Sequence, residues 1–143
     1  MASAVWKTTW NGWTTARRFQ RRGEQCVLCG SSAVGGDSIE HMARCRVTRE
    51  LSSYVNIPIS HYSHWLGNFV ILGVNHGSVE DSLLVKRAVV VYAIYRTSNK
   101  LRHSPARSNE EARDMAQQYT KEAVRGHVNA TAMLESFCLG ASL

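Results

Sequence analysis

Three cysteines and a histidine near the start of the chain have the types and spacing of metal ligands. Cys26 and Cys29 form a C-x2-C pair, and His41 and Cys45 follow eleven residues later as H-x3-C. A C-x2-C pair makes a tight knuckle whose sulfurs converge, and side chains four residues apart share one face of a helix. Three sulfurs and one nitrogen suit tetrahedral Zn²⁺, and four protein ligands leave no position for a reactive water. The pattern therefore predicts a closed structural zinc site, and a protein that is not an enzyme.

The chain is basic, and most of its positive charge near the cysteines is arginine. It has 17 Lys+Arg against 11 Asp+Glu, a formal charge of +6 and a pI of about 9.5. Because the planar guanidinium suits bidentate phosphate contact, we expect RNA or DNA as the partner. A solvated basic surface is the alternative. The expected nucleic-acid-binding residues are Arg17, Arg18, Arg21, Arg22, Arg44, Arg46 and Arg49.

Trp10 and Trp13 stand just before the first arginine pair. Aromatic rings of this kind can stack on unpaired bases, and this is the binding role we assign to them. For at least two of the three aromatic residues Trp10, Trp13 and Phe19, however, we expect packing in the hydrophobic core.

The cysteine pattern and the hydropathy bear on the compartment. Clustered cysteines without a secretory signal favour metal binding over a disulfide framework. The longest apolar run, Ala88 to Ile94, is far shorter than the ~20 residues that a membrane helix needs. The Arg-, Ser- and Thr-rich start also has the composition of a mitochondrial transit peptide, but its tryptophans argue against a removable leader. We expect a nuclear or cytoplasmic protein that is not secreted and has no membrane contact; its oligomeric state stays open.

Helices are expected to position the ligands. Asp37 and Glu40 stand in the D-x-x-E relation of a capping box, so we expect one helix from Asp37 to about Ser53 that carries His41 and Cys45 on one side. Three more helices follow from their caps, apolar spacing and stop signals, with Gly126 as the residue that ends the second of them. They are expected at 78–101, 108–125 and 129–137.

These expectations define a mainly α fold, a small helical domain with an N-terminal zinc knuckle. Residues 1–57 form a basic zinc-knuckle region, and residues 58–143 form a helical region packed on it, together as one structural unit. A length of 143 residues fits a single compact domain.

The runs NGWTTARRFQRRGEQCVLCGSS and DSIEHMARC carry a resemblance to a known family. They resemble the cysteine-histidine (CCHC) segment that follows the reverse transcriptase domain in LINE-type non-LTR retrotransposon polyproteins, including element-derived reading frames of dinoflagellates. The resemblance covers residues 10–45 and extends less closely to about residue 103. It implies a tail fragment whose parent binds element RNA or target DNA. The paired aspartates of the polymerase core are missing here, so no polymerase activity is implied.

Two other functions remain open. In an HNH-type nuclease, His41 would be the base, Asn56 the orienting residue, and His61 or His64 a metal ligand. That role excludes His41 as a zinc ligand, leaves Cys45 unexplained and places Pro58 where a ligand-bearing helix should lie. The third possibility is a helical protein-interaction module built from residues 78–125.

Overall fold

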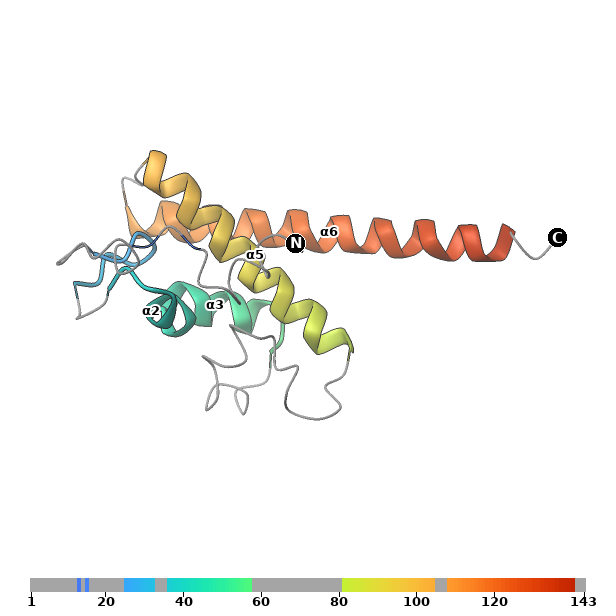
Figure 1. Cartoon of the computed structure of the whole chain (residues 1–143), viewed down its shortest axis with the longest axis horizontal. Coiled ribbons are helices and arrows are strands. Elements are labelled where there is room, and N and C mark those ends of the chain that lie inside the picture. Colours follow the sequence, from blue (N-terminus) through green and yellow to red (C-terminus); the bar gives the residue numbers. More distant parts are fainter. Residues whose placement is uncertain are drawn as a thin grey trace.

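The computed structural model describes residues 13, 15, 25–32, 36–57, 81–104 and 108–140, with side chains described at 82–104 and 108–128 in the last two ranges. These residues form helices and, within these ranges, no strand. The mainly α fold is therefore confirmed. The helices are α2 (Ile39–Arg44), α3 (Arg46–Tyr54), α5 (Asp81–His103) and α6 (Asn109–Gly140) (Figure 1).

The first predicted helix is two helices, because the chain bends at Cys45. This residue has φ −56° and ψ 144°, so it ends α2 and begins α3. A helical ψ would be near −42°. The Thr48 hydroxyl donates to the Met42 carbonyl at 2.5 Å and so satisfies a group that the broken helix leaves without its usual partner. A single helix through this segment was a wrong expectation.

The N-cap of α2 also differs from the expected one. Ser38 is the cap, and its hydroxyl accepts a hydrogen bond from the backbone N–H of His41 at 3.1 Å. Asp37 was expected in this role, but its carboxylate is held elsewhere, by Arg102. The N-cap of α2 therefore lies one residue later in the chain than the D-x-x-E pattern indicated.

Helix α5 is the central element of the packed helices. Its predicted start, Ser78, lies outside the described residues, and its end at His103 is close to the predicted end. Its apolar middle buries Val90, Ala93 and Ile94, which explains why this segment has almost no polar face. The helix packs against both α3 and α6, and α3 also contacts α6.

Helix α6 is longer than expected. Ser108 accepts a hydrogen bond from the Glu111 N–H at 3.2 Å, which confirms the predicted start. The predicted stop at Gly126 and the separate helix at 129–137 are wrong, because α6 continues unbroken to Gly140. A helical glycine costs only about 1 kcal/mol relative to alanine, too little to stop a helix whose neighbours on both sides favour it. In Figure 1 the last part of α6 runs well past the other helices.

One hydrophobic cluster joins the N-terminal segments to the long helices. It contains Trp13, Cys26 and Leu28 together with Ile94 of α5 and Ala116 of α6. Residues from both sides of position 57 thus share one core. Within the part of the chain that the structure describes, none of the helices combines the length and apolar content that a bilayer-spanning segment needs.

Candidate metal centre

The C-x2-C pair lies in a tight turn that is closed by backbone hydrogen bonds. The Gly30 N–H donates to the Cys26 carbonyl at 2.8 Å, and the Cys26 N–H donates to the Ser31 carbonyl at 2.9 Å. Gly30 has φ +68°, a conformation that L side chains rarely adopt. A Cβ atom at this position would also lie 3.3 Å from Oδ1 of Asn109, the first residue of α6. The turn therefore rests against the start of α6 and favours glycine at position 30.

The four predicted ligands come together at this turn. The Sγ atoms of Cys26 and Cys45 are 4.0 Å apart, and Sγ of Cys29 is 3.3 Å from Nε2 of His41. All four ligand atoms lie within 4.8 Å of one another, and the three cysteines are free thiols. Cys26 and Cys45 are buried, while Cys29 and His41 are partly buried. This cluster could bind one metal ion.

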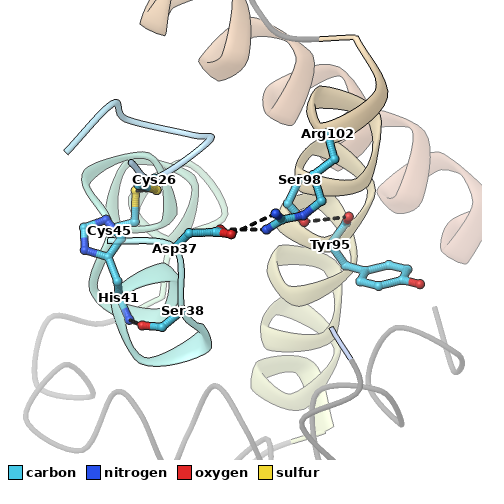
Figure 2. Close-up of polar contacts among 8 residues, drawn as sticks. All are labelled: Cys26, Asp37, Ser38, His41, Cys45, Tyr95, Ser98 and Arg102. Carbon is cyan, nitrogen blue, oxygen red and sulfur yellow. Dashed lines mark hydrogen bonds and ion pairs between the residues drawn. The ribbon is translucent and has the colours of Figure 1, made fainter. Parts of the chain in front are cut away.

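The bend at Cys45 is what brings the ligands of α2 toward the turn. His41 lies in α2 and Cys45 lies between α2 and α3, where its sulfur approaches Cys26 (Figure 2). Leu28, Met42 and Ala43 are fully buried around these residues, so the cluster is built into the core and not attached to its surface.

Without a metal ion, the thiols of the cluster strongly shift one another's pKa values. A hydrogen bond from the Cys45 thiol lowers the pKa of Cys26 to about 5. The same hydrogen bond, together with burial, raises the pKa of Cys45. Burial also raises the pKa of Cys29. Without a cation the cluster thus favours one thiolate over three, because each further negative charge would be buried beside the first. A bound cation would stabilise all three thiolates, because its positive charge offsets their mutual repulsion. The thiolate is also the form in which cysteine binds a metal.

An ion pair connects the cluster to α5. The Arg102 guanidinium donates two hydrogen bonds to the Asp37 carboxylate, at 2.8 and 2.6 Å. The Asp37 side chain is completely buried and that of Arg102 is 14% exposed. In Figure 2 Asp37 points away from the thiols and toward α5, while Ser38 and His41 continue into the ligand-bearing helix. Arg102 therefore helps to position the ligands, although its place in the sequence, 65 residues from Asp37, gave no sign of this role.

Three of the seven predicted arginines lie in the described residues. Arg44, Arg46 and Arg49 are all exposed on α2 and α3, and the first two flank Cys45 directly. Arg46 forms an exposed ion pair with Glu50 at 2.8 Å. The other four predicted arginines, Arg17, Arg18, Arg21 and Arg22, lie outside the described residues, as does Trp10.

Trp13 packs in the core. It is only 1% exposed, and its ring meets Tyr95 of α5 edge-to-face, with the centroids 5.2 Å apart and an angle of 67° between the planes. Of the two roles considered for this residue, core packing is the one that the structure contains, and its ring faces are not available to bases.

The residues of the nuclease alternative are only partly described. Asn56 is exposed just after α3 and has φ 57°, a conformation that asparagine tolerates well at the end of a helix. His61 and His64 lie outside the described residues. His41, the base in that alternative, is 3.3 Å from the Cys29 sulfur and belongs to the thiol cluster.

Sequence reasoning missed two residues that shape the centre, Thr48 and Arg102. Thr48 is fully buried inside α3 and donates to the Met42 carbonyl, and its place in the sequence gave no sign of this contact. No family model, curated protein or solved structure matches this chain.

Proposed function

We propose that this chain is a non-catalytic, zinc-stabilised nucleic-acid-binding module. The observation that carries the proposal is the convergence of three thiols and one imidazole at a bend whose neighbours on both sides, Arg44 and Arg46, are exposed cations. The cluster supplies the zinc-binding part of the proposal, and the arginines supply the part that concerns nucleic acid.

The distances within the cluster support zinc as the ion. In a tetrahedral site with Zn–S of about 2.3 Å and Zn–N of about 2.0 Å, sulfurs lie roughly 3.8 Å apart and sulfur lies roughly 3.5 Å from nitrogen. The corresponding separations here are 4.0 Å between Cys26 and Cys45 and 3.3 Å between Cys29 and His41. A Cys₃His donor set is also typical of structural zinc and less suited to magnesium or calcium, which prefer oxygen.

A four-ligand site of this kind has a structural role and no catalytic one. Zinc enzymes keep one coordination position for water or substrate, whereas here the protein would supply all four ligands. Bound zinc would hold the turn at Cys26, helix α2 and the start of α3 together. Because the site is part of the core, the free energy of metal binding adds to the free energy of folding.

Nucleic acid is the partner that the charge favours. The chain carries a formal charge of +6, and the exposed arginines of α2 and α3 are attached to elements whose positions the metal would fix. Guanidinium groups on a fixed scaffold lose less entropy when they bind phosphate. The resemblance to the tail segments of LINE-type polyproteins supports the same class of partner, element RNA or target DNA.

The nuclease alternative is less well supported. It requires His41 to be free to accept a proton from water, but this imidazole is within reach of the Cys29 thiol in a cluster that also explains Cys45. A magnesium-dependent cleavage assay tests this alternative directly. Cleavage that is lost in His41→Ala would favour the nuclease and contradict the non-catalytic function.

Salt dependence of binding is the decisive experiment for the proposed function. Fluorescence anisotropy with a single-stranded RNA and a duplex DNA of equal length would measure affinity from low to physiological salt. For phosphate contacts we expect log K to fall linearly with log salt, with a slope of about −0.7 to −0.9 for each phosphate contacted. Affinity that does not change with salt would contradict the proposal.

Arginine variants locate the binding surface. Arg44→Gln should weaken binding to all sequences alike and reduce the salt slope by about one contact. Lys100→Gln is the matched control, because this exposed lysine near the end of α5 lies outside α2 and α3 and undergoes the same loss of charge. Equal losses in the two variants would mean that binding depends on the total charge and not on this surface.

A further inference from the structure

A groove between α3, α5 and α6 lies away from the metal centre. It has a volume of about 930 Å³ and is lined by the end of α3, the first half of α5 and the middle of α6. Arg102, which binds Asp37, is 16 residues beyond Lys86 of the groove, or about 24 Å along a helix. The groove is therefore separate from the residues of the proposed zinc site.

The two long walls of the groove have the same pattern. Helix α5 contributes Ser82, Val85, Lys86 and Val89, and helix α6 contributes Lys121, Val124 and Arg125. Within each helix these positions follow the spacing i, i+3, i+4 that places side chains on one face. The α5 wall therefore has two valines and one lysine, and these residues of the α6 wall are one valine and two cations.

The groove is open and its apolar surface is partly exposed. Tyr54 is 50% exposed at the end of α3, and Val124 is 41% exposed on α6. Val128, one turn beyond Val124 on the same face, is 58% exposed. The lining residues include Lys86, Lys121, Arg125 and His127 and no acidic residue.

We propose that this groove binds an acidic amphipathic helix of a partner protein. A helix laid between α5 and α6 would bury one apolar stripe on the valines, as in other helix-in-groove complexes. Its flanking positions would face the cations of both walls, so acidic residues there would complement the charge. An open groove suits such an occupant because only one face of an amphipathic helix needs burial.

Two other occupants fit the groove less well. A second copy of this chain would also carry +6, so a contact at a basic groove would bring like charges together. Nucleic acid would contact the cations but would leave the valines without an apolar partner. The inference goes beyond the proposed function and does not depend on it.

A peptide selection against the full chain tests the proposal. The library displays helices of about 18 residues, roughly 27 Å long, with a leucine stripe and flanking positions mixed among Glu, Gln and Lys. A second library has the same composition with the stripe scrambled. We expect enrichment of leucine-stripe helices with Glu at the flanks, and no enrichment from the scrambled library.

Charge reversal in the groove gives the sharpest prediction. In Lys121→Glu/Arg125→Glu the selected acidic helices should bind about tenfold more weakly or worse, and a new selection should enrich Lys at the flanks. Lys100→Glu/Arg113→Glu changes the charge by the same amount at positions outside the groove lining and should leave the selection unchanged. Val124→Ser, at an exposed wall position, should weaken binding without changing the melting temperature.

Four results would overturn the proposal. The first is no enrichment of striped helices over scrambled ones, and the second is continued enrichment of Glu against the charge-reversed groove. The third is displacement of the bound peptide by a single-stranded oligonucleotide, which would assign the groove to nucleic acid. The fourth is self-association of the wild-type chain that Val124→Ser abolishes, which would assign the groove to a second copy. The outcome is independent of zinc content and of the salt slope for nucleic acid.

Discussion

The Arg102 guanidinium donates two hydrogen bonds to the Asp37 carboxylate, and Asp37 immediately precedes the N-cap of the helix that carries His41. The pair joins the last turn of α5 to the first turn of α2, so a residue near position 100 helps to position His41, a candidate metal ligand. Because the Asp37 side chain has no contact with water, this connection is sensitive to the loss of either partner.

Removing Arg102 should destabilise the protein strongly. Arg102→Ala would remove the guanidinium that pairs with a buried carboxylate, a change that typically costs about 3–5 kcal/mol. Arg102→Lys should recover only part of this, because an ammonium group cannot reproduce the two parallel hydrogen bonds. Urea unfolding would measure the losses.

Arg46→Ala is the control for that series. Arg46 also pairs with a carboxylate, that of Glu50 at 2.8 Å, but its side chain is 76% exposed. Exposed pairs contribute at most about 1 kcal/mol. Similar losses in Arg102→Ala and Arg46→Ala would show that the Asp37 contact has no special role.

Loss of a ligand should release the metal. Cys45→Ala removes one of four ligands, so elemental analysis should find one zinc per chain in the wild type, as proposed, and much less in the variant. The melting temperature should fall with it, because metal binding and folding are coupled. Cys138→Ala is the control, since Cys138 is the one cysteine outside the C-x2-C and H-x3-C motifs. Unchanged zinc in Cys45→Ala would contradict the ligand assignment.

The bend between α2 and α3 should depend on Thr48. In Thr48→Val the Met42 carbonyl would keep only its 3.4 Å contact with the Cys45 N–H, and we expect a loss of about 1–2 kcal/mol in the free energy of unfolding. Thr97→Val is the matched control, because the Thr97 hydroxyl bonds the Ala93 carbonyl inside an unbroken helix. That carbonyl retains its backbone partner, so its variant should lose less. The idea fails if the two variants are equally stable.

The metal-free, reduced protein should contain a thiolate at neutral pH. Because the pKa of Cys26 is lowered from 9.0 to about 5, this thiolate should persist at pH 7 and disappear as the pH falls through about 5. Absorbance near 240 nm, taken as the difference between wild type and Cys26→Ser, would follow it. In Cys45→Ala the midpoint should move up, since the hydrogen bond that lowers this pKa is lost. Identical titrations of wild type and Cys26→Ser would rule out the assignment.

Gly126 should be replaceable by alanine with a gain in helix stability. It lies inside α6, and an added Cβ would meet nothing within 4 Å. We expect Gly126→Ala to stabilise this part of α6 by about 1 kcal/mol, visible as slower amide exchange around residue 126. Gly30→Ala should do the opposite, because Gly30 has a positive φ and lies close to Asn109. A destabilised Gly126→Ala would mean that α6 is interrupted there, as the sequence had indicated.

The ligand set and most of the helices could be predicted from local sequence. The spacing of Cys26, Cys29, His41 and Cys45 depends only on the geometry of a turn and a helix, and the cap at Ser108 depends on residues three apart. Such short-range relations are read directly from the chain. The zinc itself, and the role of the arginines, remain predictions.

The features that the sequence did not predict depend on distant contacts or on weak local preferences. The D-x-x-E pattern indicated that Asp37 was a helix cap. Its partner is instead Arg102, which is 65 residues away and therefore could not be recognised from the local sequence. The segment around Cys45 contains no glycine or proline that would indicate a bend, and the Thr48 hydroxyl bonds the buried Met42 carbonyl from within the next helix. Gly126 has a real but small helix-breaking tendency, which a long helix overcomes.

Cys45 has a consequence for how this sequence can vary. The same residue ends α2, begins α3 and supplies a sulfur to the cluster. One residue inserted or deleted between His41 and Thr48 would rotate one helix by about 100° relative to the other. This rotation would move His41 or Cys45 away from the cluster, or the Thr48 hydroxyl away from the Met42 carbonyl. Related sequences should therefore keep the His41–Thr48 interval at constant length, while the interval between Cys29 and Asp37, which holds no ligand, can gain or lose residues.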